Sequence, residues 1–374
     1  MRLFRILILV LFIILYANCT RQSEKNLGDS VQNRKFKIQN FDNFTLIHIR
    51  DAWQNASDAN FKYILSESLS NVPDSLNGYK FIKTPVRRVI VFSTTHVGFL
   101  LEIEEGNSII AASGRNYIYD EGLKNKVKKN EIKEIGFAPG INYESIIELK
   151  PDVIFIYGLE SSVTGIVSRL ESVGIQSVII GDYLENHPLG KMEWIKVFSA
   201  FYNKEKLADS IFNMASEKYH DLCSLVTEKV ESRPTVMLGL PWKDSWNMAG
   251  GRSFTAKLIH DAGGNYLWSD NNSEEFLPLA IESVIQTSLN SDCWLNTGSA
   301  RSLNDIIQRD KRYKAFNAWK THSMYNNDKQ FNGEANNFWE KGVVEPHIIL
   351  RDMIKIFHPE IIPDKELVYY RKLE

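Results

Sequence analysis

The stretch from Met192 to Glu231 contains neither Gly nor Pro and has the pattern of helix throughout. Asn203 is placed to begin a helix of about 27 residues, which at ~1.5 Å per residue is ~40 Å long. Strand-like apolar runs alternate with helical segments on both sides of it. We therefore predict an α/β fold, with two lobes of mostly parallel sheets joined by one long α-helix. The expected boundaries are an N-terminal lobe at 41–190, bridging helices at 191–232 and a C-terminal lobe at 233–374.

The N-terminal lobe shows the clearest local signals. Val89–Phe92 is predicted to be a buried strand, and the hydroxyl of Ser93 can cap a helix that starts near His96. Asn142 can cap the helix Tyr143–Leu149 in the same way. Such strand–helix units imply parallel strands with right-handed crossovers. Further strands are expected at 108–112, 135–138, 153–157 and 177–180, with edge strands at 44–53 and 79–83.

The C-terminal lobe repeats this style. Its expected elements are a strand at Thr235–Leu240, a helix capped by Ser253, a helix at Ile281–Leu289, a strand at Cys293–Asn296 and a long helix within Asn337–Phe357.

Segments 144–158 and 282–298 share a pattern, in which a helix that begins with Glu-Ser leads through a turn to a strand. In each segment an aspartate stands six residues before a glycine. This internal similarity predicts that the two lobes are related by pseudo-symmetry. The pairs are Asp152 with Gly158 and Asp292 with Gly298.

The N-terminus has the features of an export signal. Arg2 and Arg5 precede an apolar run at 6–15 that is too short to span a bilayer, and Cys19 follows shortly after. We predict a lipoprotein signal peptide at 1–18, lipidation of Cys19 and a flexible polar tether at 19–40. Tyr16 and Asn18 depart from the usual pattern, so ordinary secretion with Cys19 as a bystander is the alternative. Either interpretation predicts a location outside the cytoplasm, and the lipid anchor predicts the cell envelope.

The composition excludes several classes of function. With 44% hydrophobic residues, 24% charged residues and a net charge of -2, the chain has no basic excess for nucleic acid. Cys223 and Cys293 are predicted to be free thiols, because no CxxC pair indicates zinc or redox chemistry. The eight histidines are scattered. We therefore expect no intrinsic cofactor and no protein-built metal site.

Several short motifs, taken in order, resemble the substrate-binding proteins of ABC importers for ferric siderophores, haem and cobalamin. The resemblance covers about residues 85 to 360. The motifs are Val91-Phe92-Ser93-Thr94, Asn142-Tyr143-Glu144, Leu149-Lys150-Pro151-Asp152-Val153, the stretch from Pro188 to Trp194, Asp261-Ala262-Gly263-Gly264, Trp339-Glu340 and the stretch from Asp352 to Pro359.

The resemblance implies a partner and a cargo. The partner is an ABC permease dimer with its ATPase subunits. By the resemblance, Glu144 in the first lobe and Glu282 in the second meet arginines of this permease. Each glutamate also favours the positive end of its own helix, by ~0.3–1 kcal/mol, which is the plainer explanation for its position. The cargo is a pre-chelated metal, with ferric siderophore ranked first, cobalamin a close second, and haem also possible. The carrier is expected to be a monomer, lipid-anchored on the periplasmic side, whose rigid bridge limits lobe motion to a small rocking.

In a two-lobed α/β protein the ligand lies at the carboxyl ends of the strands. Aromatic rings there can match the apolar face of a chelate, and arginines can bind its carboxylates or phenolates. By the resemblance, Tyr117 and the stretch Asn336–Glu340 fall about where corrinoid-binding members contact their ligand. The predicted ligand-binding residues are Thr95, Arg115, Tyr117, Tyr183, Trp242, Trp246, Arg252, Asn337 and Trp339.

Two alternatives remain open. His96 could be an axial ligand to the metal of a haem or corrinoid, although a lone histidine near a helix start is more often an ordinary hydrogen-bonded group. The chain could also be an extracytoplasmic small-ligand sensor or a hydrolase on a bilobal scaffold. No G-x-S-x-G motif accompanies Ser93, so we predict no catalytic residues and no enzyme activity.

Overall fold

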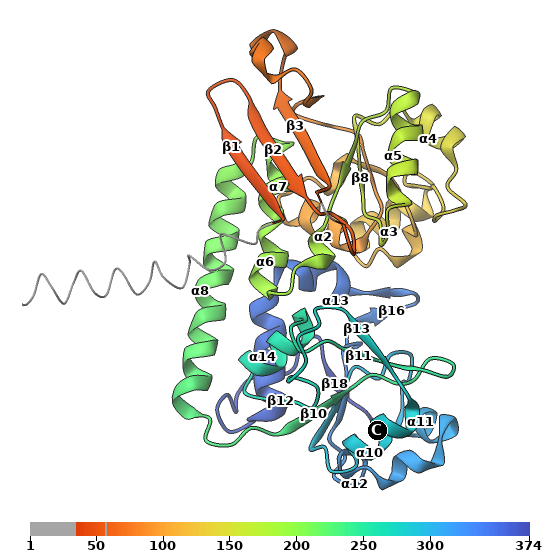
Figure 1. Ribbon diagram of the computed structural model, residues 1–374, viewed down its shortest axis with the longest axis vertical. Coiled ribbons are helices and arrows are strands. Elements are labelled where there is room, and N and C mark those ends of the chain that lie inside the picture. The colour runs from red at the N-terminus through yellow and green to blue at the C-terminus, as the bar shows by residue number, and fades with distance from the viewer. Residues whose placement is uncertain (1–34, 57) are drawn as a thin grey trace, which may run out of the picture.

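The computed structural model describes residues 35–56 and 58–374 and has two lobes beside one long helix (Figure 1). The predicted signal peptide, Cys19 and most of the predicted tether lie outside the described residues. No helix in the described ranges is long and apolar enough to cross a membrane.

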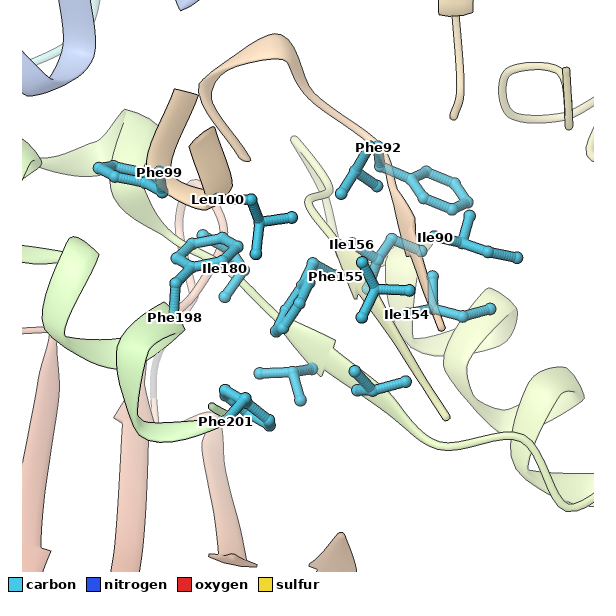
Figure 2. Packing of buried hydrophobic residues seen from close by; sticks show 14 of the residues in the cluster. Ile90, Phe92, Phe99, Leu100, Ile154, Phe155, Ile156, Ile180, Phe198 and Phe201 are labelled. Atoms are coloured by element: carbon cyan, nitrogen blue, oxygen red, sulfur yellow. The ribbon is translucent and has the colours of Figure 1, made fainter. Parts of the chain in front are cut away.

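The N-terminal lobe is built on a fully parallel five-stranded sheet of order β7-β6-β5-β8-β9. Apolar side chains fill the space between the sheet and the helices. Figure 2 shows Phe155 from β8 beside Phe198 and Phe201, with ring centroids 4.6 and 5.0 Å apart. The strands are β5 (Val89–Val91), β6 (Ile109–Ala112), β7 (Lys133–Glu134), β8 (Val153–Ile156) and β9 (Ser177–Ile179), and the helices are α2 (Thr94–Glu102), α3 (Glu121–Lys128), α4 (Tyr143–Leu149) and α5 (Val163–Ser172).

The predicted helix caps of this lobe are confirmed. The Ser93 hydroxyl accepts a hydrogen bond from the Thr95 amide (3.2 Å), and Asn142 Oδ1 accepts one from the Ser145 amide (2.9 Å). A cap satisfies an amide of the first turn that has no partner within the helix.

A separate four-stranded sheet of order β1-β2-β3-β4 precedes this lobe and packs on it. The sequence indicated only edge strands here and placed the tether up to residue 40; the ordered fold instead begins by Phe36. The rings of Phe36 and Trp194 meet edge to face at 4.9 Å, and the Tyr63 hydroxyl accepts a hydrogen bond from the Ile179 amide of β9 (3.4 Å). The strands are β1 (Phe36–Asn40), β2 (Thr45–Arg50), β3 (Asn60–Ser66) and β4 (Lys80–Lys83).

The bridge consists of α6 (Pro188–Glu193), α7 (Ile195–Ala200) and α8 (Glu205–Lys229). Helix α8 has 25 residues and runs along one side of both lobes, as predicted (Figure 1). Its predicted start was wrong by two residues. Asn203 has φ 58°, in the left-handed region that asparagine tolerates, and therefore ends the preceding turn rather than capping α8.

The C-terminal lobe has a sheet of order β12-β10-β14-β15-β18, parallel except for β18. The long helix predicted within Asn337–Phe357 is confirmed as α14 (Pro346–Phe357), which begins with a proline after the short helix α13 (Asn337–Glu340) and a turn. The main strands are β10 (Thr235–Leu238), β12 (Asn265–Tyr266), β14 (Cys293–Leu295), β15 (Met324–Asn326) and β18 (Arg371–Lys372). Two further antiparallel pairs are β11 (Trp246–Ala249) with β13 (Phe276–Leu279), and the hairpin of β16 (Phe331–Asn332) with β17 (Ala335–Asn336). The helices are α9 (Phe254–Asp261), α10 (Ile281–Ser288), α11 (Leu303–Arg309), α12 (Asn317–Lys320), α13 (Asn337–Glu340) and α14 (Pro346–Phe357).

The two aspartates of the internal repeat occupy equivalent places. Asp152 precedes β8, and its carboxylate accepts hydrogen bonds from the amides of Arg87 (2.7 Å) and Arg88 (2.9 Å) at the start of β5. Asp292 precedes β14, and its carboxylate accepts one from the amide of Thr235 (2.8 Å) at the start of β10. The repeated sequence pattern therefore corresponds to the same strand-to-strand junction in each lobe.

Candidate ligand-binding site

A cavity of about 400 Å³ lies between the lobes. Its N-terminal wall comprises the β2–β3 loop, residues 51–56, and residues 183–186 after β9. Its C-terminal wall comprises the start of α9, residues 274–276 before and in β13, and the start of α13. A site of this size and position, shared by both halves of the chain, is typical of small-ligand binding.

Aromatic side chains dominate the apolar part of this wall. They come from both lobes, and the most exposed are Phe276 (69%) and Trp339 (51%). Rings of this kind bury apolar ligand area and leave polar edges for hydrogen bonds. The aromatic lining residues are Trp53, Tyr183, Phe254, Phe276, Phe338, Trp339 and Tyr370.

Acidic groups outnumber basic ones around the cavity. Four carboxylates face two lysines, and no arginine within the described ranges lines it. Burial raises the pKa of Glu185 to about 7, although the indole N–H of Trp194 donates to its carboxylate (3.0 Å). The site thus favours neutral or cationic ligands over anionic ones. The charged lining residues are Asp51, Glu185, Glu274, Glu275, Lys35 and Lys191.

Trp339 also separates this cavity from a second one of about 280 Å³. The second cavity lies at the carboxyl ends of β5, β6 and β8 and faces the β16–β17 hairpin. Tyr117 and Phe137 belong to its wall, with ring centroids 6.3 Å apart. The two cavities share Trp339, so this side chain is in contact with both.

The lobes are held together beside the cavity by Glu340. Its buried carboxylate accepts hydrogen bonds from the amides of Tyr119 (2.7 Å) and Asp120 (2.9 Å) across the lobe boundary. Its backbone carbonyl lies so close to Gly98 of α2 that a Cβ there would be 2.0 Å from the oxygen. Burial raises the pKa of Glu340 to about 7, against the effect of its two amide donors. These contacts join the lobes tightly at this point.

Comparison with known proteins defines the family. The sequence profile of the periplasmic binding protein family matches residues 89–331, more than half of the chain. The chain belongs to this family. The four strands β1–β4 lie outside the matched region, as does the stretch that contains Trp339 and Glu340.

Relatives and solved structures agree with this membership. An uncharacterized lipoprotein of Methanocaldococcus jannaschii is 28% identical over 306 residues, covering 79% of this chain and 71% of its own. Among solved structures, a periplasmic haem-binding protein from Pseudomonas aeruginosa superposes with a TM-score of 0.57 at 12% identity, covering 74% of this chain and 94% of its own. An ABC-type Fe³⁺-hydroxamate transport protein from Saccharomonospora viridis gives 0.55 at 17%, covering 73% and 94%. These likenesses show a shared two-lobed fold.

Four of the predicted ligand-binding residues of this periplasmic binding protein reach the cavities. Tyr183 and Trp339 line the main cavity, Tyr117 lines the second, and Thr95 lines a small pocket that also includes Trp339. The Tyr183 hydroxyl donates to the Gly158 carbonyl (2.8 Å), and burial raises its pKa to about 12, so it is a neutral hydrogen-bonding group.

Two predicted aromatic or amide contacts were wrong because the side chains are structural. Trp246 is fully buried in the core of the C-terminal lobe, and its indole N–H donates to the Leu238 carbonyl (3.0 Å). Asn337 is buried, and its amide donates to the side chain of Gln330 (2.6 Å). Neither is available to a ligand between the lobes.

Three other predicted residues are not brought to the cavities. The Arg115 guanidinium donates to Asn130 Oδ1 (2.9 Å) and to the Ile132 carbonyl (2.8 Å). It therefore points away from the lobe boundary. Trp242 is 71% exposed, in a turn whose backbone pairs with Ser245, and it lines none of the described cavities. Arg252 lines none of them either.

His96 is part of the core of the N-terminal lobe, so its suggested role as an axial ligand is wrong. It is fully buried, with its ring centroid 5.5 Å from that of Phe198 and 6.5 Å from that of Tyr157. Burial lowers its pKa to about 4, and the ring is neutral at neutral pH. Within the described ranges no cluster of His, Cys, Asp and Glu could hold a metal ion.

The structure adds residues that sequence reasoning missed, above all Asp51 and Trp53 of the β2–β3 loop. They follow a strand of a sheet that the sequence indicated only faintly. No local motif marks them, because their place in the wall depends on how the whole sheet packs on the lobe.

Glu144 and Glu282 are both exposed in the first turn of their helices, one in each lobe. Figure 1 shows α4 and α10 on the side of the lobes away from α8. Glu282 lies 3.4 Å from the guanidinium of Arg312, which also contacts Asp310 (2.6 Å). Glu144 takes part in no ion pair of the described residues. Both carboxylates are accessible to a partner, with the charge of Glu282 partly compensated.

Proposed function

We propose that this protein is the substrate-binding component of an ABC importer, and that it captures a metal chelate between its lobes. The observation that carries the proposal is the aromatic cavity of about 400 Å³ at the lobe boundary of a periplasmic binding protein. Aromatic walls suit a chelate, whose organic shell offers apolar area that a bare ion lacks.

The charge and size of the cavity support an order among the possible cargoes. A ferric siderophore with hydroxamate donors comes first, because three hydroxamate anions balance Fe³⁺ and leave a complex that four carboxylates do not repel. Cobalamin comes second, because it is large for a cavity of about 400 Å³ unless it also occupies the second one. Haem and triscatecholate complexes come last, since both carry negative charge.

Delivery follows capture in this proposal. The loaded protein, a monomer, docks on an inner-membrane permease dimer with its ATPase subunits through Glu144 and Glu282. Cys19 carries the lipid that keeps the protein beside the membrane in the cell envelope. The exposure of both glutamates and their equivalent helix positions support the docking role.

Native mass spectrometry and absorbance titration test the capture step. The chain without residues 1–19 is titrated with a ferric trishydroxamate, a ferric triscatecholate, cyanocobalamin and haemin. One-to-one binding of a chelate at micromolar concentration or below is the expected result. If the protein binds none of the four chelates, the proposed function is overturned.

A further inference from the structure

The β1–β4 sheet lies outside the region that matches the family, yet it supplies part of the cavity wall. It is fixed to the N-terminal lobe at several points. Besides the Phe36–Trp194 contact, the Tyr63 hydroxyl of β3 accepts a hydrogen bond from the Ile179 amide of β9 (3.4 Å), and Lys80 of β4 forms an ion pair with Glu171 of α5. The sheet therefore moves with the lobe.

The β2–β3 loop, residues 51–56, is held in place by its own contacts. The Asp51 amide donates to the Ala59 carbonyl (2.8 Å), which closes the base of the loop. The Gln54 amide donates to the Leu159 carbonyl (3.3 Å), which ties its tip to the loop after β8. The Trp53 ring packs edge-on against Phe61 at 5.8 Å. A loop anchored at both ends presents its side chains in a fixed geometry.

Asp51 brings to the cavity a carboxylate whose hydrogen bonding is incomplete. Its Oδ1 atom is buried and has no hydrogen-bond partner in the described part of the chain. A buried carboxylate oxygen without a donor is costly, and such groups are normally satisfied. Glu274 and Glu275 line the facing wall, and Glu274 accepts a hydrogen bond from Asn186 across the lobe boundary (3.0 Å). Asp51 lines the cavity, so a donor group on a ligand bound there would complete the hydrogen bonding of this carboxylate.

We propose that the β2–β3 loop is the specificity-determining wall of this carrier. Asp51 binds an ammonium group or another strong hydrogen-bond donor on the periphery of the chelate, and Trp53 packs against the organic shell beside it. This inference rests on the proposed function, and it adds the feature that distinguishes the preferred chelate from others of the same metal and donor set.

The test uses two forms of one probe, a linear ferric trishydroxamate with a free terminal amine and the same complex N-acetylated. The wild type is expected to bind the amine form about tenfold more tightly, which corresponds to one charge-assisted hydrogen bond. Asp51→Asn is expected to remove most of this preference. Trp53→Ala is expected to weaken both forms about tenfold and leave their ratio unchanged.

Matched controls lie in the same chain. Asp58→Asn changes an exposed aspartate near the same loop that lines no described cavity, and Trp242→Ala removes an exposed tryptophan outside the cavities. Both are expected to bind like the wild type. If Trp53→Ala perturbs folding, Trp53→Phe provides the second test. It keeps an aromatic ring and is expected to retain most of the affinity.

The outcomes separate the two proposals. A wild type that binds neither form, nor any of the other chelates, overturns the proposed function. A wild type that binds the probe while Asp51→Asn keeps the full preference for the amine, or Trp53→Ala binds like Trp242→Ala, overturns this inference alone. Binding of haemin alone would also overturn this inference, because haemin carries carboxylates at its periphery and no ammonium group or other strong donor for Asp51.

Discussion

The two lobes share a frame and differ in what they add to it. Asp152 and Asp292 join equivalent strands in the two sheets, so the repeated unit sets the scaffold. Segments outside the repeated unit supply part of the cavity wall. The N-terminal lobe adds the β2–β3 loop, and the C-terminal lobe adds α13 with Phe338 and Trp339. The repeated unit thus accounts for the strand junctions, and the added segments give the cavity part of its individual wall.

The two glutamates proposed to dock on a permease show the same contrast on a smaller scale. Glu144 and Glu282 occupy equivalent helix starts, but only Glu282 has a basic neighbour, Arg312, among the described residues. An exposed ion pair contributes little to stability, yet it changes the charge that a partner meets. Equivalent positions in the two lobes are therefore not equivalent in electrostatics.

The strongest test of this equivalence is charge reversal. Glu144→Lys with Glu282→Lys is expected to abolish uptake in cells, because both contacts with the permease become repulsive. Chelate affinity of the purified variant is expected to remain unchanged. Of the single variants, Glu144→Lys should reduce uptake more, since the charge of Glu282 is already partly compensated. Loss of affinity in the double variant would show that these residues are not docking sites.

The next largest effect concerns the contact between the lobes. Gly98→Ala places a Cβ 2.0 Å from the Glu340 carbonyl oxygen, and relief requires the lobes to separate. We expect the free energy of unfolding to fall by about 3 kcal/mol, which would be seen as a fall in Tm of about 5–10 °C. Gly165→Ala in α5 is the control, because a Cβ there has nothing within 4 Å and favours the helix. Equal Tm values for the two variants would contradict a tight lobe contact.

Glu340 is buried and Glu185 is partly buried, one in each lobe beside the cavity, and both should make stability depend on pH in the same direction. Burial raises the pKa of Glu340 and that of Glu185 to about 7, from an ordinary 4.5. A carboxyl group whose pKa is higher in the folded than in the unfolded state stabilises the fold fully below about pH 4.5. This contribution is lost as the pH rises through about 7. Glu340→Gln and Glu185→Gln should therefore each gain stability relative to wild type between pH 5 and 8, by about 1–2 kcal/mol.

Denaturant unfolding at several pH values measures this difference. Glu160→Gln, at an exposed position, serves as the control and is expected to follow the wild type at every pH. A constant difference between Glu340→Gln and wild type over this range would show that the carboxyl does not titrate there.

The smallest effect tests the repeated junction itself. Asp152→Asn and Asp292→Asn each weaken a carboxylate that accepts hydrogen bonds from the neighbouring strand. We expect each to cost about 1 kcal/mol in the free energy of unfolding, measured by urea titration. If the two substitutions lower the free energy of unfolding by amounts that differ severalfold, the two junctions are not energetically equivalent.

Much of the frame was predictable because its signals are local. Ser93 and Asn142 were recognised as caps from their position relative to the following helix, and capping depends on only a few neighbouring residues. Asn203 shows the limit of such signals, because asparagine suits both a cap and a left-handed turn, and the chain adopts the turn.

The site was predictable only in part, because its residues depend on packing between distant segments. Trp246 and Trp339 look alike in the sequence, but one is sealed in the core and the other is half exposed at the lobe boundary. Arg115 follows its strand as expected, yet Asn130 and the Ile132 carbonyl draw its guanidinium to the outer face. Burial and side-chain direction are set by the assembled fold.

The close approach of Gly98 to Glu340 has a consequence for kinetics. This contact disfavours a wide separation of the lobes, so the cavity is already formed when a ligand arrives. Association then needs no slow rearrangement, and related ligands would differ mainly in residence time. For the importer component proposed above, release would then require the permease to separate the lobes, and docking would set the rate of unloading.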